Sequence, residues 1–216
     1  MFDDLLLRLA LGIVPLILGF TIHEAAHAFM AYKLGDRTAR SQGRLTLNPV
    51  AHIDPMGSIV FPLIGLAMGG IMFGWAKPVP VDTRNFKSPR KGMFWVALAG
   101  PASNLAMAVI WALIGMGMAH VGQGEEGWLF LMAISGVQIN LVLMAFNLLP
   151  LPPLDGSKML ERFLKGNALN SFRNFGAQAG ILLLILVFTG ILGKFYLRPI
   201  LMFFSWLGYM IGLPTL

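Results

Sequence analysis

The sequence predicts an all-α polytopic membrane protein, a bundle of about five or six transmembrane helices with a re-entrant segment and short β-strands near the cytoplasmic face. Of its 216 residues, 56% are hydrophobic and only 12% are charged, whereas soluble domains carry about 25% charged residues. The mean hydropathy is +0.73, and several apolar runs reach about 20 residues, the length that crosses a bilayer. We therefore expect residues 1–216 to form a single integral membrane domain.

The apolar runs supply the predicted elements in chain order. They are 9–32, 58–74, 92–119, 128–150, 174–193 and 196–213. The first, third and fourth runs are long enough to cross the hydrocarbon core, and the fifth is expected to do so as well. The last is interrupted near its start by Arg198 and Pro199. The second is short, rich in glycine and contains Pro62, so it either spans the bilayer or re-enters it.

Basic residues indicate which loops face the cytoplasm. The stretches 33–44, 77–91 and 155–173 hold most of the 16 Lys and Arg residues, while 120–127 carries acidic charges only. The positive-inside rule puts the three basic stretches in the cytoplasm, and we interpret their charge as a topology signal beside anionic lipid rather than a nucleic-acid-binding face. Since 33–44 and 77–91 then lie on one side, 58–74 is interpreted as re-entrant. This interpretation gives five spans with the N-terminus outside.

Two short segments near the predicted cytoplasmic face have the composition of small strands. Residues 43–47 (GRLTL) and 75–81 (WAKPVPV) are rich in β-branched or apolar side chains and are bounded by turn-forming residues. Pro78 and Pro80 would confine the second strand to the edge of a sheet, where their missing N–H donors do no harm.

The first apolar run contains a metal-binding pattern, His23-Glu24-Ala25-Ala26-His27. On a helix, this H-E-x-x-H spacing puts both imidazoles on one face at the separation that zinc needs, with the glutamate beside them. The pattern also arises by chance in helices. In a membrane helix the chance interpretation weakens, because an unpaired Glu24 would cost about 2.5–3.5 kcal/mol or more.

A catalytic zinc usually has three protein ligands, so a third ligand is expected beyond His23 and His27. The chain has no cysteine, which leaves a carboxylate or a histidine. The best candidate is Asp155, because the prolines of the NLLPLPPLDG stretch end the preceding helix and hold a rigid extended turn. Asp155 could instead be a turn or helix-capping residue. His52 and Asp54 are alternative ligands, although loop-shaping roles suit them better.

Catalytic roles can be assigned to two further side chains. Glu24 would take the proton from a zinc-activated water and pass it to the leaving amine. Asn147, late in its helix, is a candidate donor to the oxyanion. Alternatively, Asn147, Asn140 and Asn104 could simply form hydrogen bonds between helices.

Five stretches together carry a more specific pattern. They are FTIHEAAHAFMAYKLGD (20–36), GRLTLNPVAHIDPMGSIVFP (43–62), FGWAKPVPVDTRNF (73–86), ALAGPASNLAMA (97–108) and FNLLPLPPLDGSKML (146–160). In these stretches the chain resembles the site-2 protease family of intramembrane zinc metalloproteases, in its short form without PDZ or CBS modules. One departure is that the H-E-x-x-H helix comes first here, whereas larger members have a helix before it.

The resemblance implies that His23, His27 and Asp155 bind one Zn²⁺ per chain and that Glu24 is the catalytic acid/base. It also implies that Asn147 assists with the substrate or the oxyanion, and that Asn104 packs the helical core. The implied activity is hydrolysis of peptide bonds in or near transmembrane segments. The partners would be a transmembrane protein substrate and membrane lipids, in a multi-pass protein of the cell membrane with its active site toward the cytoplasm.

Such a protease would need to unwind its substrate helix before cleavage. We hypothesise that Trp75–Val81 captures the unwound segment by β-addition. Two other functions remain as alternatives. One is a zinc-stabilised regulator without proteolysis; the other is a small ion or proton transporter in which His23, Glu24 and Asp155 form a relay. Transporters often contain inverted repeats, and none is detected here.

Overall fold

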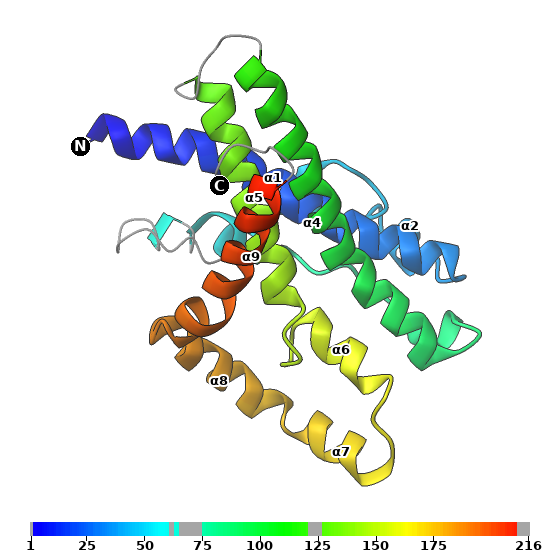
Figure 1. Ribbon diagram of the computed structural model, residues 1–216. Coiled ribbons are helices and arrows are strands. Elements are labelled where there is room, and N and C mark those ends of the chain that lie inside the picture. Colours follow the sequence, from blue (N-terminus) through cyan, green and yellow to red (C-terminus); the bar gives the residue numbers. More distant parts are fainter. Residues whose placement is uncertain (1, 61–62, 65–74, 121–126, 211–216) are drawn as a thin grey trace.

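The computed structural model describes residues 2–60, 63–64, 75–120 and 127–210 (Figure 1). Three long helices dominate it: α1 (Phe2–Lys33), α4 (Pro89–His120) and α5 (Trp128–Asn147). The shorter helices are α2 (Thr38–Ser41), α6 (Asp155–Glu161), α7 (Gly166–Asn174), α8 (Gly176–Phe188) and α9 (Arg198–Met210). Single 3₁₀ or π turns are η1 (Pro49–Ala51), η2 (Pro55–Val60), η3 (Thr83–Asn85) and η4 (Gly193–Leu197).

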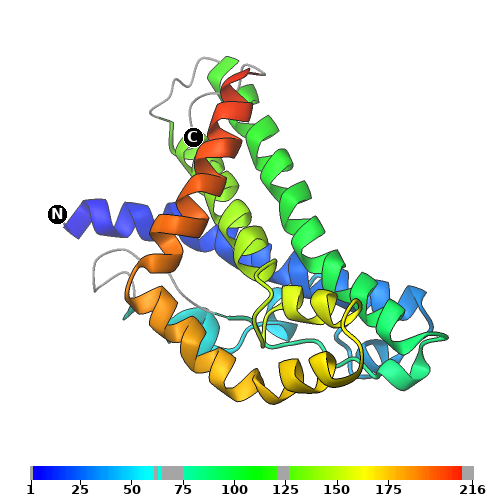
Figure 2. The same cartoon turned by 60° about the horizontal axis from the view of Figure 1, so that its bottom comes forward.

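The long helices form the centre of the molecule. Helices α4 and α5 run antiparallel, and α1 lies across them (Figures 1 and 2). Small residues allow this close packing, since a side chain at Gly136 of α5 would overlap the ring of Trp111 on α4. Gly19 of α1 likewise leaves room for Leu143 and Asn140 of α5.

The chain returns to α5 through η4 and α9, and α9 lies beside α5 (Figure 2). Leu183 and Leu192 pack with Leu149 and Leu154, which flank the proline-rich turn after α5. In addition, the hydroxyl group of Tyr196 donates a hydrogen bond of 3.1 Å to a carbonyl near the end of α5. This packing covers the connection that leads from α5 to α6.

Three helices among the described residues are long and apolar enough to cross a membrane: Ala10–Lys33, Pro89–Ala119 and Trp128–Asn147. A fourth span is possible only if Gly166–Asn174 and Gln178–Phe188, which meet at 60°, act as one. Helix α8 has 13 residues and is about 20 Å long, shorter than the hydrocarbon core of about 30 Å. Helix α9 also has 13 residues, but it continues without a break from the π turn η4. The described residues thus contain three helices of spanning length, or four with the bent pair, and the predicted five or six spans are not confirmed.

The two predicted strands are absent from the structure, which assigns no strand to 43–47 or 75–81. Instead, the N–H groups of Trp75 and Lys77 donate to the carbonyls of Gly57 and His52, at 3.0 and 2.9 Å. These acceptors belong to a loop and a π turn, so no ladder forms. Most of the predicted re-entrant segment, 58–74, lies outside the described residues.

Candidate metal centre

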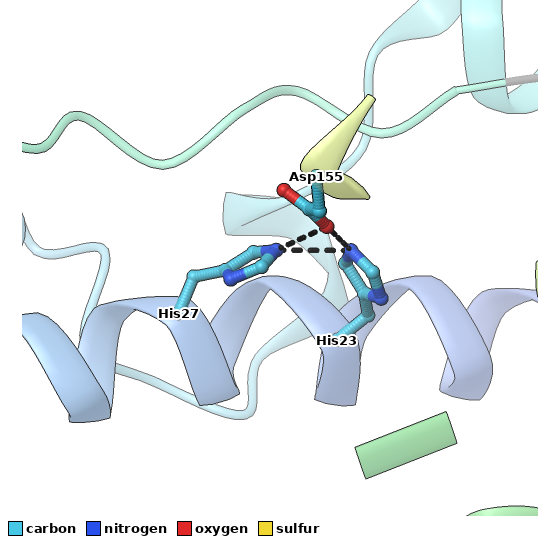
Figure 3. Close-up of side chains that lie close together, drawn as sticks. All are labelled: His23, His27 and Asp155. Carbon is cyan, nitrogen blue, oxygen red and sulfur yellow. Dashed lines mark hydrogen bonds and ion pairs between the residues drawn. The ribbon is translucent and has the colours of Figure 1, made fainter. Parts of the chain in front are cut away.

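Two histidines of α1 and the first residue of α6 meet at one point (Figure 3). The Nε2 atoms of His23 and His27 are 3.0 Å apart, and they lie 3.2 and 3.1 Å from Oδ2 of Asp155. All three residues are buried. The structure thus brings together the three residues that sequence analysis nominated as ligands.

Hydrogen bonds on the far side of each ring determine which nitrogen carries the proton. Nδ1 of His23 lies 2.6 Å from Oδ1 of Asn104, and Nδ1 of His27 lies 2.7 Å from the carbonyl oxygen of Val96. Both oxygens accept hydrogen bonds only, so each Nδ1 must be the donor. In a neutral imidazole this leaves a lone pair on Nε2, and in both rings that lone pair faces the centre.

This arrangement fits a bound cation. Two Nε2 lone pairs and a carboxylate oxygen converge, and Oδ2 of Asp155 is buried without a hydrogen-bond donor. Without a proton or cation between them, these groups repel one another. In a tetrahedral zinc site, ligand atoms about 2.0–2.2 Å from the metal are about 3.3–3.6 Å apart, close to the separations found here. The donor set, His₂Asp, also suits zinc and leaves a fourth position open.

Helix α4 supports both imidazole rings through a glycine. A Cβ atom at Gly100 would lie 2.5 Å from Nε2 of His27 and 2.6 Å from Cε1 of His23. Only a glycine therefore allows the helix to approach the rings so closely. Next to it, Pro101 has no N–H group and interrupts the hydrogen-bond ladder of α4. Gly100 was not predicted from the sequence, although a Gly-Pro pair inside an apolar helix was an available signal.

A buried pair of asparagines extends from His23 into the helix core. Asn104 donates from Nδ2 to Oδ1 of Asn140 at 3.1 Å and to the carbonyl of Gly19 at 3.3 Å. Asn140 in turn donates to the carbonyl of Gly136 at 2.9 Å. These bonds fix the orientation of the Asn104 amide, which therefore presents its oxygen to His23. Asn104, expected only to pack the core, thus also orients a candidate ligand.

Two contacts position Asp155 at the start of α6. A Cβ atom at Gly156 would overlap the backbone carbonyls of Leu148 and Leu149, so glycine allows α6 to begin directly against the end of α5. At the other end of α6, the guanidinium group of Arg90 on α4 donates to the backbone carbonyls of Glu161 and Leu164. Helix α6, and Asp155 with it, is thereby tied to both long helices.

Glu24 lies beside the candidate ligands on α1 and is 9% exposed. Its Oε2 accepts a hydrogen bond of 2.8 Å from the backbone N–H of Val79. The segment 75–81 therefore passes directly over the proposed base. Its N–H groups at Trp75, Lys77 and Val79 are all used by the chain itself, and Pro78 and Pro80 have none. The N–H groups of Ala76 and Val81 have no partner among the described residues, so the hypothesis that this segment captures a substrate strand by β-addition stays a prediction.

Asn147 is not brought into this group. Its Nδ2 donates to the carbonyl of Leu143 at 3.0 Å, one turn earlier in α5. The alternative ligands also have other partners: His52 bonds through Nε2 to the carbonyl of Thr46, and Asp54 accepts from the N–H of Gly57. Both shape the loop between α2 and η2.

The chain is similar to known proteins over most of its length. Residues 116–187 match the model of peptidase family M50. The chain is 43% identical over 194 residues to "Putative zinc metalloprotease YwhC" of Bacillus subtilis, an alignment that covers 88% of this chain and 84% of the relative. It is 30% identical over 192 residues to "Putative zinc metalloprotease Rip2" of Mycolicibacterium smegmatis, covering 89% and 72%. No solved structure matches the chain.

Proposed function

The chain belongs to peptidase family M50, the site-2 protease family, and on that premise we propose that it is an intramembrane zinc metalloprotease. The observation that carries the proposal is the convergence of two imidazole lone pairs and one carboxylate oxygen, within 3.2 Å of one another. His23, His27 and Asp155 would hold the zinc ion, and residues 1–216 would act as one membrane domain. Neither a zinc-stabilised regulator nor a transporter is favoured by any observation on the described residues.

The proposed reaction is hydrolysis of a peptide bond. When bound, zinc supplies Lewis-acid polarisation of the scissile carbonyl and of the attacking water. Glu24 takes a proton from the water and delivers it to the leaving amine. The Val79 amide donates to Oε2 of Glu24, which leaves Oε1 and the second lone pair of Oε2 for that transfer. Asn147 would have to give up its bond to Leu143 before it could assist the oxyanion.

We propose that the substrate is a transmembrane segment of another membrane protein, cut in or near the bilayer. The support is that α1, α4 and α5, which supply or surround the ligands, include the three helices of membrane-spanning length. We further propose a multi-pass protein of the cell membrane, in contact with lipid, whose site faces the cytoplasm. Basic residues such as Lys33 and Lys158, close in sequence to His27 and Asp155, support that orientation.

Substitution of Glu24 by glutamine tests the proposed reaction. We expect Glu24→Gln to retain zinc, because the three ligands are unchanged. We also expect it to cleave tagged single-span membrane proteins at least about 100-fold more slowly than the wild type, the usual contribution of a general base. Purified wild type and variant would be compared in detergent for metal content and for product formation. Cleavage by the variant at the wild-type rate would contradict the proposal.

A further inference from the structure

Arg44 is a buried cation to which the proposed reaction gives no role. It is 8% exposed, and its Nη2 donates to the carbonyl oxygen of Lys77 at 2.6 Å, with that of Pro78 at 3.5 Å. Gly43, at a φ of 68°, turns the chain after α2 and allows Arg44 to point inward. Because burying a guanidinium group is costly unless its donors are matched, this placement needs an explanation.

The segment that Arg44 holds is built to present one amide. The Lys77 N–H donates to the carbonyl of His52 at 2.9 Å, which fixes the start of the segment. Pro78 and Pro80 flank Val79, have no N–H group and restrict φ. The only N–H between Lys77 and Val81 is therefore that of Val79.

That single amide faces the proposed base. The Val79 N–H donates to Oε2 of Glu24 at 2.8 Å, so the carboxylate is fixed by an atom two residues from the carbonyl that Arg44 binds. A base held in one orientation transfers a proton more efficiently than one that rotates freely. We propose that Arg44 is a positioning residue for Glu24, acting through the rigid segment Lys77–Val79. This inference rests on the proposed function, because it assigns Glu24 as the base.

The experiment combines kinetics with a structural reporter. The chain has no cysteine, so Lys77→Cys, at an exposed side chain, introduces a single site for a spin label. We expect Arg44→Ala to increase the mobility of the label and to lower kcat by about 10–100-fold, with KM and zinc content unchanged. Arg44→Lys should recover part of kcat, because one ammonium group can still reach the Lys77 carbonyl. The matched control is Arg37→Ala, which removes the same charge from an exposed position in the same stretch.

A second pair of variants tests the amide without altering Arg44. Val79→Pro removes the N–H group, whereas Val79→Ala keeps it and removes only the side chain. We expect kcat to fall further in Val79→Pro than in Val79→Ala.

The outcomes separate the inference from the function on which it rests. An unchanged label mobility in Arg44→Ala, or a mobile label with an unchanged kcat, would overturn the positioning role. Loss of zinc together with activity in Arg44→Ala and Val79→Pro would also overturn it, because both residues would then support the fold. If the wild type holds zinc but cleaves no membrane protein, the proposed function fails. The label mobility would still test whether Arg44 holds the segment.

Discussion

Gly100 and Asn104 give the metal centre its geometry without being ligands. Gly100 leaves the space that the two imidazole rings occupy, and Asn104 sets the tautomer and angle of the His23 ring. The sequence predicts His23, His27 and Asp155 as ligands, because helical spacing and a proline-rich turn are local features. The Gly-Pro pair marks Gly100 as unusual, but its role and that of Val96 as supports were not predictable, since which residues of α4 face α1 depends on how the two helices pack.

Substitution of Gly100 by alanine tests this support. The added Cβ would overlap both rings, so we expect Gly100→Ala to weaken zinc binding by about 10–100-fold, the usual effect of disturbing groups that orient metal ligands. Competition with a zinc chelator measures the change. Gly117→Ala is the matched control, because it lies on the same helix and its Cβ would meet nothing within 4 Å. Equal zinc affinity in the two variants would contradict this account.

At the scale of elements, the connection between α1 and α4 depends on Asp36. This buried carboxylate accepts hydrogen bonds from the backbone and hydroxyl of Thr38, the backbone of Asp82 and the amide of Asn85. It thereby joins the end of α1 to the loop that follows Trp75–Val81. The preceding segment, 75–81, shows why the strand prediction failed. Its composition favoured a strand. Its paired backbone N–H groups, however, donate to separate acceptors, such as the carbonyl of His52 and the carboxylate of Glu24, rather than to a neighbouring strand.

The role of Asp36 predicts a pH-dependent stability. Burial acts to raise the pKa of Asp36, but its hydrogen bonds prevail and lower that pKa below the ordinary value. A carboxylate whose pKa is lower in the folded than in the unfolded state contributes its full stabilisation at pH values above the unfolded-state pKa of about 4. This stabilisation is lost as the pH falls through the folded-state pKa. We expect Asp36→Asn to lower the free energy of unfolding at pH 7 by about 1–3 kcal/mol.

Unfolding in detergent, followed at pH 7 and below pH 4, measures this effect. The free energies of unfolding of the wild type and Asp36→Asn should differ less below pH 4 than at pH 7. Asp82→Asn provides the comparison, since that carboxylate pairs with the exposed Arg84 and is expected to matter less. If Asp36→Asn lowered the free energy of unfolding equally at both pH values, the proposed contribution of the Asp36 carboxylate would be excluded.

At the scale of the whole molecule, α1, α4 and α5 hold the site, and the C-terminal helices cover the turn that leads to Asp155. Long apolar runs predicted the three central helices, because length and hydropathy alone identify such segments. The C-terminal region was harder to predict. The apolar run 174–193 is broken at Gly190, where φ is 72°, and a run of apolar residues does not reveal such a turn.

Zinc content per chain tests the central claim most directly. We would measure it in detergent, after supplying metal, for the wild type, Asp155→Ala and Asp54→Ala. The proposed site predicts about one zinc in the wild type and much less in Asp155→Ala. It also predicts about one zinc in Asp54→Ala, because the Asp54 carboxylate accepts a hydrogen bond from the N–H of Gly57 and is not one of the three ligands. Full zinc in Asp155→Ala, or none in the wild type, would contradict the metal centre described here.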